Sequence, residues 1–223
     1  MVTQTQLTSG SGTSASSFTT ASIAPSTAQL IVISIISKIS STNPSEAAAN
    51  GLGLSWNLAG SVLQTGSQHV RLNMYYALSL TPITPGTMTV TFASQVQDDF
   101  VWNVTQLGNV FADSSDGVNS IIQIQTSNTG GVNPSVNYNT FAKPTNAAFG
   151  VVGSLNLGTS YTPGGSFSQI FSNTSSQEII EGAFLGQSAT SVGWTQGGGQ
   201  NYPTAVIALE INFLPSGALL MLF

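Results

Sequence analysis

The chain has 223 residues, of which 41% are hydrophobic and only 5% are charged, with three Lys and Arg against eight Asp and Glu. Three scattered cations cannot form the basic patch that nucleic-acid binding needs, and the absence of cysteine excludes thiolate metal sites and disulfides. A surface of Ser, Thr, Asn, Gln and Gly carries little charge repulsion, which suits a protein that packs against copies of itself or a scaffold.

The first 15 residues are rich in Ser, Thr, Gly and Gln and have no apolar periodicity, which predicts a flexible N-terminal arm over 1–15. From residue 16 onward, apolar residues recur with the period of strands, between clusters of Gly, Pro, Asn and Ser. One helical turn is expected over 44–50. We predict strands over 17–23, 29–40, 54–63, 70–80, 87–92, 101–107, 121–126, 135–141, 148–155, 167–171, 178–185, 191–194 and 204–213.

Several of these strands indicate which face is buried. The even-numbered residues from Val70 to Leu78 are apolar and should share one face, and Met88, Val90 and Phe92 should point inward. The run 30–36 is apolar on both faces, which predicts a central strand covered on both sides. This series of short strands predicts an all-β fold, an antiparallel β-sandwich of jelly-roll type with little or no helix, and residues 16–223 as a single domain.

No catalytic set emerges from the titratable residues. The single histidine, His69, has no triad context. Glu178 and Glu181 lie three residues apart on one strand, so their side chains point to opposite faces and cannot converge on a glycosidic bond. We interpret this pair as solubilising an edge strand, and we expect no enzymatic activity.

The acidic loop Asp113-Ser-Ser-Asp116-Gly-Val-Asn119 is a candidate calcium site. Calcium favours clustered carboxylates and carbonyls on a glycine-containing loop, but the spacing differs from that of an EF-hand. Asp, Asn, Ser and Gly are also ordinary turn residues. The alternatives are therefore a calcium site formed by Asp113, Asp116 and Asn119 or a plain turn, with no other cofactor implied.

Aromatic residues in the second half could stack on a sugar. We expect exposed rings at Tyr75, Tyr138 and Tyr161, and the best cluster for a glycan or partner is formed by Trp194, Gln200, Asn201 and Tyr202. The alternative is a glycine-rich loop with packing aromatics.

The apolar runs are too short to cross a membrane, since 30–36 and 214–223 fall well below the about 20 residues that a spanning helix needs. The N-terminus lacks the basic and apolar regions of a secretory signal, which predicts assembly without export. The charge-free C-terminal run would aggregate if exposed. We expect it to pack at a subunit interface through Leu219, Leu220, Leu222 and Phe223.

Five segments follow one another in a characteristic order. They are Leu30-Ile-Val-Ile-Ser-Ile, Gly53-Leu-Ser-Trp-Asn-Leu, Arg71-Leu-Asn-Met-Tyr-Tyr-Ala, Pro85-Gly-Thr-Met-Thr-Val-Thr-Phe and Trp102-Asn-Val-Thr-Gln-Leu-Gly-Asn-Val. With this order the chain resembles, over about residues 17–213, a recurring β-sandwich of tailed-bacteriophage virion proteins. It departs from that pattern where Phe111-Ala precedes Asp113.

The resemblance implies a virion component assembled in the host cytoplasm. The expected function is a capsid decoration (cement) protein that binds across major capsid subunits as a homotrimer and stabilises the shell by multivalency. Two alternatives stay open. One is a tail or fibre module that binds a receptor or carbohydrate, and the other is a filament subunit that donates a strand to its neighbour.

Overall fold

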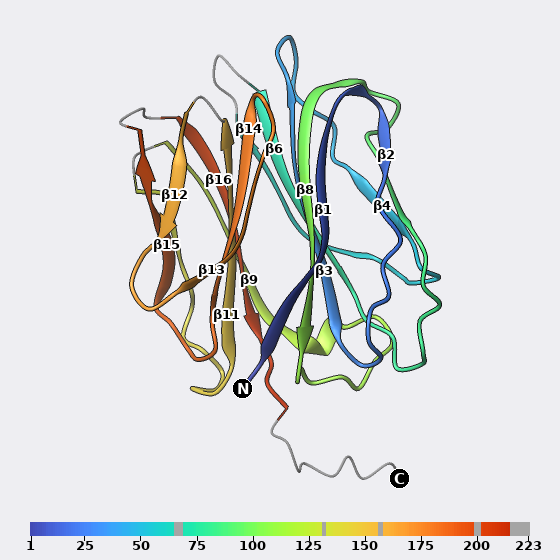
Figure 1. The fold of residues 1–223 in the computed structure, drawn as a ribbon. Helices are drawn as coiled ribbons and strands as arrows, with labels where there is room; N and C mark the ends of the chain where they lie inside the picture. The colour runs from blue at the N-terminus through green and yellow to red at the C-terminus, as the bar shows by residue number, and fades with distance from the viewer. Residues whose placement is uncertain (65–68, 131–132, 156–157, 199–201, 215–223) are drawn as a thin grey trace.

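The computed structural model describes residues 1–64, 69–130, 133–155, 158–198 and 202–214, which form sixteen strands and one short 3-10 helix, Val118–Ser120 (Figure 1). The first eight strands are β1 Thr3–Ala15, β2 Ser17–Thr19, β3 Leu30–Ile39, β4 Ala48–Gly51, β5 Asn57–Gln64, β6 His69–Ala77, β7 Met88–Thr91 and β8 Gln97–Gly108. The second eight are β9 Ile121–Gly130, β10 Ser135–Asn137, β11 Ala147–Leu155, β12 Ser160–Pro163, β13 Ser168–Thr174, β14 Glu178–Leu185, β15 Ser191–Gly197 and β16 Pro203–Ile211.

The two sets of eight strands fold in the same way. In the first repeat a five-stranded sheet has the order β1-β8-β3-β6-β5, and a three-stranded sheet has the order β2-β7-β4. The second repeat has the orders β9-β16-β11-β14-β13 and β10-β15-β12, which are the same orders with eight added to each number. All pairs are antiparallel. The chain is therefore a structural duplication.

The four sheets stack as layers, with the two five-stranded sheets in the middle and a three-stranded sheet outside each (Figure 1). Three hydrophobic clusters fill the three gaps between layers. The central cluster joins residues of both repeats, such as Leu72 and Phe149, and makes them one compact unit. The two outer clusters each belong to one repeat, around Phe92 in the first and Val192 in the second.

A pseudo-two-fold axis relates the two repeats. Across the central layer β1 lies opposite β13 and β5 lies opposite β9, while β8 packs on β14 and β6 packs on β16. In the second repeat, β9 is the counterpart of β1 and β13 is the counterpart of β5. The contact between β1 and β13 therefore corresponds to the contact between β9 and β5, and likewise β8 on β14 corresponds to β16 on β6. This exchange is the property of a two-fold interface, here within one chain.

The all-β antiparallel sandwich class is confirmed. The jelly-roll type stays a prediction, because β5 and β13 extend the larger sheets and leave them five and three strands wide. The first strand of each repeat does pair with its last, the second with its seventh and the third with its sixth. A single sandwich over 16–223 was too simple a prediction, since the described residues form two sandwiches that share a central core.

The flexible arm predicted over 1–15 is wrong, because β1 pairs with β8 along nearly its whole length. Glycines at alternate positions make room for aromatic rings of the partner strand. A Cβ on Gly10 would lie 2.6 Å from the Trp102 ring, and a Cβ on Gly12 would lie 2.4 Å from the Phe100 ring. The rings cover the glycine backbone, so a polar, glycine-containing segment is stable as an edge strand.

The predicted faces are confirmed. All ten residues of β3 are buried in the middle of its sheet, and Met88, Val90 and Phe92 are fully buried in the outer core of the first repeat. The even-numbered residues from Val70 to Leu78 lie in the central core. The helical turn predicted over 44–50 is absent, because Ala48–Gly51 pair with β7 as strand β4.

Candidate functional site

The two five-stranded sheets end in four edge strands that lie in pairs on two lateral faces of the molecule. On one face β1 runs beside β13, and the amide of Asn173 donates a hydrogen bond to the Ser9 hydroxyl at 3.0 Å. On the other, β5 runs beside β9, and the amide of Asn128 donates to the Leu63 carbonyl at 2.7 Å. We call these faces the β1/β13 edge and the β5/β9 edge; the pseudo-two-fold axis exchanges them.

The four edge strands contain no charged residue, and proline is absent from all four. Charges, especially Lys, and proline are the usual protection against pairing with another chain. Each of the four edge strands carries one bulge, where the register shifts by a residue. The bulged residues are all apolar and lie on counterpart strands of the two repeats, Leu7 and Ile122 on β1 and β9, and Ala59 and Ile170 on β5 and β13.

The rest of the surface is even less charged than the composition indicates. Four of the eight acidic side chains, Asp99, Glu178, Glu181 and Glu210, are buried. Of the three cations, Lys38 is buried and Arg71 is half-buried, where its guanidinium donates to the Pro44 carbonyl and the Ser61 hydroxyl. Lys143 is exposed. The accessible surface is therefore almost entirely neutral.

A polar cluster joins the two repeats at one end of the central core. The Lys38 ammonium on β3 donates to the side-chain oxygen of Gln177 at 2.6 Å. The Asp99 carboxylate on β8 accepts from the Ser175 hydroxyl at 2.6 Å and from the backbone N–H of Gln177 at 2.9 Å. Lys38 and Asp99 are register partners on adjacent strands. The turn between β13 and β14 is thus fastened to the sheet of the other repeat by charged groups.

Glu178 lies beside this cluster without a hydrogen-bond partner on either carboxyl oxygen among the described residues. Burial, and next the negative charge of Asp99, raise the pKa of Glu178 well above its usual range, while Lys38 opposes this. The buried Glu210, unlike Glu178, has hydrogen-bond partners, because its carboxylate accepts from the side chains of Gln123 and Asn146 and from the backbone of Ala142 at 2.6 to 2.9 Å. Burial between the repeats therefore favours the neutral form of the Glu178 carboxyl.

Glu178 and Glu181 do point to opposite faces of their sheet, toward the central and the outer core. The edge-strand role expected for them is wrong, because β14 is flanked by β13 and β11 and both side chains are at most 1% exposed. The two charges predicted an edge strand because charged residues are typical of sheet edges. A strand between two other layers is instead covered on both faces.

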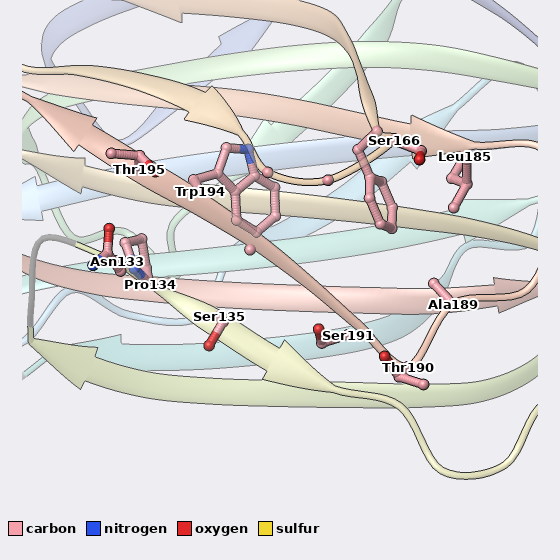
Figure 2. Close-up of a pocket in the computed structure, with 14 residues that line it drawn as sticks. Asn133, Pro134, Ser135, Ser166, Leu185, Ala189, Thr190, Ser191, Trp194 and Thr195 are labelled. Carbon is pink, nitrogen blue, oxygen red and sulfur yellow. The ribbon is translucent and has the colours of Figure 1, made fainter.

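A groove lies at the outer three-stranded sheet of the second repeat (Figure 2). It encloses about 490 Å³ and is bounded by segment 133–135 on one side of β15 and by segment 164–167 on the other. A second hollow of about 470 Å³ begins at the Ala189 and Thr190 that both share, and continues to Tyr138 and Phe141. The two hollows are therefore neighbours on the same side of the molecule.

Trp194 is buried beneath this groove, only 2% exposed, and forms part of its lining. Its indole N–H lies close enough to the Glu181 carboxyl in the outer core to favour the ionised form, although the two are not aligned as a hydrogen bond. Burial outweighs this effect and raises the pKa of Glu181 to about 8. The Gln169 amide donates to the same carboxyl at 3.1 Å, and burial raises the pKa of the nearby Tyr161 to about 12.

The glycan cluster expected from sequence is not assembled as predicted. Trp194 packs in the outer core, whereas the half-buried Tyr202 packs against the central core on the other face of the sheet. Tyr75, Tyr138 and Tyr161, expected as exposed rings, are 3 to 8% exposed. Gln200 and Asn201 lie outside the described residues, as do the predicted contact residues Leu219, Leu220, Leu222 and Phe223.

The loop proposed for calcium is held by its own hydrogen bonds. The Asn119 amide donates to the Asp113 carboxylate at 2.9 Å, and the Asp116 carboxylate accepts from the Val118 backbone at 3.1 Å. The Asp116 carbonyl accepts from the Asn57 side chain at 3.0 Å. Asn119 thus presents a donor, not a ligand oxygen, to Asp113, and no group of three or more His, Asp or Glu able to hold a metal occurs within the described part of the chain.

No helix among the described residues is long and apolar enough to span a membrane. In comparisons with known proteins, no family model matches the chain, and no curated protein or solved structure resembles it significantly.

Proposed function

We propose that the protein is a non-enzymatic structural component of a virion, a capsid decoration protein that binds across neighbouring shell subunits and stabilises the shell. The observation that carries this proposal is the pair of lateral edges, which present four uncharged, proline-free strands on a nearly neutral surface. The resemblance of about residues 17–213 to a β-sandwich of tailed-bacteriophage virion proteins supports the virion as the setting.

A sheet edge without charges or proline can bind a partner by adding a strand, and its main-chain hydrogen bonds need no charged side chains. A neutral surface of Ser, Thr, Asn and Gln costs less free energy to desolvate on contact than a charged one. Because electrostatic repulsion between copies is weak, neighbouring copies can pack closely. Because the pseudo-two-fold axis gives two equivalent edges, one chain engages a neighbour on each side. Several weak contacts of this kind reinforce one another on a repetitive surface.

Lysine substitutions on the most exposed part of the β1/β13 edge test the proposal. Thr5 and Thr13 are exposed on β1, and the double variant Thr5→Lys, Thr13→Lys adds the charges that protect ordinary edges. The matched control is Thr91→Lys on β7, the central strand of an outer sheet. Purified protein is mixed with particles stripped of it, and the bound fraction is measured by co-sedimentation.

We expect the edge variant to bind particles about tenfold more weakly, a loss of about 1.4 kcal/mol, and the control to bind as the wild type does. Wild-type protein that stays in the supernatant, or an edge variant that sediments like the control, contradicts the proposal. The mass of the purified protein in solution distinguishes the homotrimer expected from sequence from a monomer. Spontaneous polymerisation would favour the filament alternative instead.

A further inference from the structure

We infer that the groove at the outer sheet of the second repeat binds a neutral oligosaccharide. The groove lies on the outer three-stranded sheet, and no described residue of the four edge strands lines either hollow, so this site uses a surface other than the one proposed for assembly. A concave site with an apolar part and a few convergent polar groups is the usual form of a small-ligand site.

The chemistry of the lining favours an uncharged, hydroxyl-rich ligand such as a sugar. Neither hollow is lined by a charged side chain among the described residues. Hydroxyl and amide groups make up the polar part. Serine and threonine hydroxyls both donate and accept hydrogen bonds, as sugar hydroxyls do. The polar residues that line the first hollow are Asn133, Ser135, Ser166, Thr190, Ser191 and Thr195.

Aromatic rings supply the apolar part of the same surface. The accessible rings are the half-buried Phe167 in the first hollow and the half-buried Phe141 in the second. Trp194, 2% exposed, and Tyr138, 8% exposed and 5.0 Å from Phe141 in edge-to-face contact, lie buried behind them. Sugar rings combine hydroxyl edges with apolar C–H faces, which pack on such rings. Since the two hollows share Ala189 and Thr190, the site fits an extended ligand of several sugar units better than a monosaccharide.

Trp194 is held in place from behind, which gives the groove a preformed floor. Its ring packs in the hydrophobic cluster of the outer core and is 2% exposed, so little side-chain freedom is lost when a ligand binds. The backbone around it is equally fixed, because the amides of Gly164 and Trp194 donate to the carbonyls of Gly193 and Pro134 at 2.8 and 2.9 Å.

The test is a binding titration of the full chain with a panel of neutral oligosaccharides, namely maltohexaose, cellohexaose, xylohexaose and galactan fragments, by calorimetry and by tryptophan fluorescence. Two variants change the groove. Ser191→Arg fills it with a charged side chain, and Phe167→Ala removes an aromatic wall. The matched control, Thr89→Arg, places the same side chain on β7, the equivalent strand of the first repeat.

We expect at least one oligosaccharide to bind saturably, with binding weakened about tenfold or more by each groove variant and unchanged by the control. Circular dichroism melting confirms that each variant is folded before its titration is interpreted. The inference is overturned if the wild type binds none of the panel, or if binding occurs and both folded groove variants retain it.

Discussion

Glu181 makes the stability of this protein depend on pH in a direction opposite to that of most carboxylates. Its pKa is about 8 in the folded chain, against a usual value of 4.5, because the side chain is buried in the outer core. Between these two values the folded state holds a proton that the unfolded state has released. The stabilising contribution of neutral Glu181 is therefore fully present below about pH 4.5 and is lost progressively as the pH rises to and through 8.

The difference between the two pKa values corresponds to about 5 kcal/mol at most. Relaxation and water penetration commonly reduce such penalties, so we expect Glu181 to lower the free energy of unfolding by about 2 kcal/mol between pH 5 and pH 9. Glutamine keeps the size of the side chain and an acceptor for the Gln169 amide, but it cannot ionise. Glu181→Gln should therefore be more stable than the wild type at pH 9 and similar to it at pH 5.

Urea unfolding at pH 5, 7 and 9 measures this effect. The control is Glu46→Gln, which removes a carboxylate from an exposed position and should leave the pH dependence as it is in the wild type. Part of the slope should persist in Glu181→Gln, since burial also raises the pKa of Glu178. An equal loss of stability between pH 5 and pH 9 in Glu181→Gln and the wild type would refute the reasoning.

Three further predictions concern packing and the contact between repeats. Glu178→Gln should exceed the wild type in stability by more at pH 9 than at pH 5, because burial and Asp99 disfavour the ionised form of Glu178. The same urea series measures this difference, and a pH dependence equal to that of the wild type would contradict a raised pKa of Glu178. Gly12→Val should cost about 1–3 kcal/mol in urea unfolding, because its side chain would overlap the Phe100 ring, whereas Ser11→Val at the exposed neighbouring position should change little; equal effects would mean that β1 does not pair as described. Phe149→Ala should cost about 3–5 kcal/mol and leave a single calorimetric transition, because this fully buried ring lies in the core that both repeats share; two separate transitions would show that the repeats unfold independently.

Alternation of apolar residues was enough to predict the fold class and the buried faces of the long strands. The double-sided apolar run of β3 and the inward face of β7 were identified because burial on each face leaves a period of two in the sequence. The short strands β4 and β12 were missed, since Ala48–Gly51 and Ser160–Pro163 contain the residues of turns and helix starts. Their pairing with β7 and β15 is a tertiary property that no local pattern carries.

The duplication was not visible in the sequence because a sandwich requires only the alternation and the pairing order, which many sequences satisfy. The β1 strand was missed for a related reason, since its glycines look flexible until the Trp102 and Phe100 rings of β8 cover them. Trp194 was placed on the surface by its glycine-rich surroundings. The alternation of Val192, Trp194 and Gln196 along β15 was the signal that these side chains point inward.

The groove could not be predicted at all, because segments 133–135, 164–167 and 189–195 are distant in sequence and meet only through the sheet order of the second repeat. The Trp194 predicted as a sugar contact does line it, but the partners predicted with it do not. Residues such as Phe167 and Ser191 carried no signal of their own, since a phenylalanine in a strand usually indicates a core position and serine is common on exposed surfaces.

The most direct test of the proposed virion role is quantitative mass spectrometry of density-gradient fractions of the virus particles from the protein's source. If the protein is a shell component, its peptides peak with intact particles. Their ratio to the major shell protein is then fixed and stays the same through repeated banding. Peptides confined to the soluble fractions, or a ratio that falls with each purification step, would contradict it.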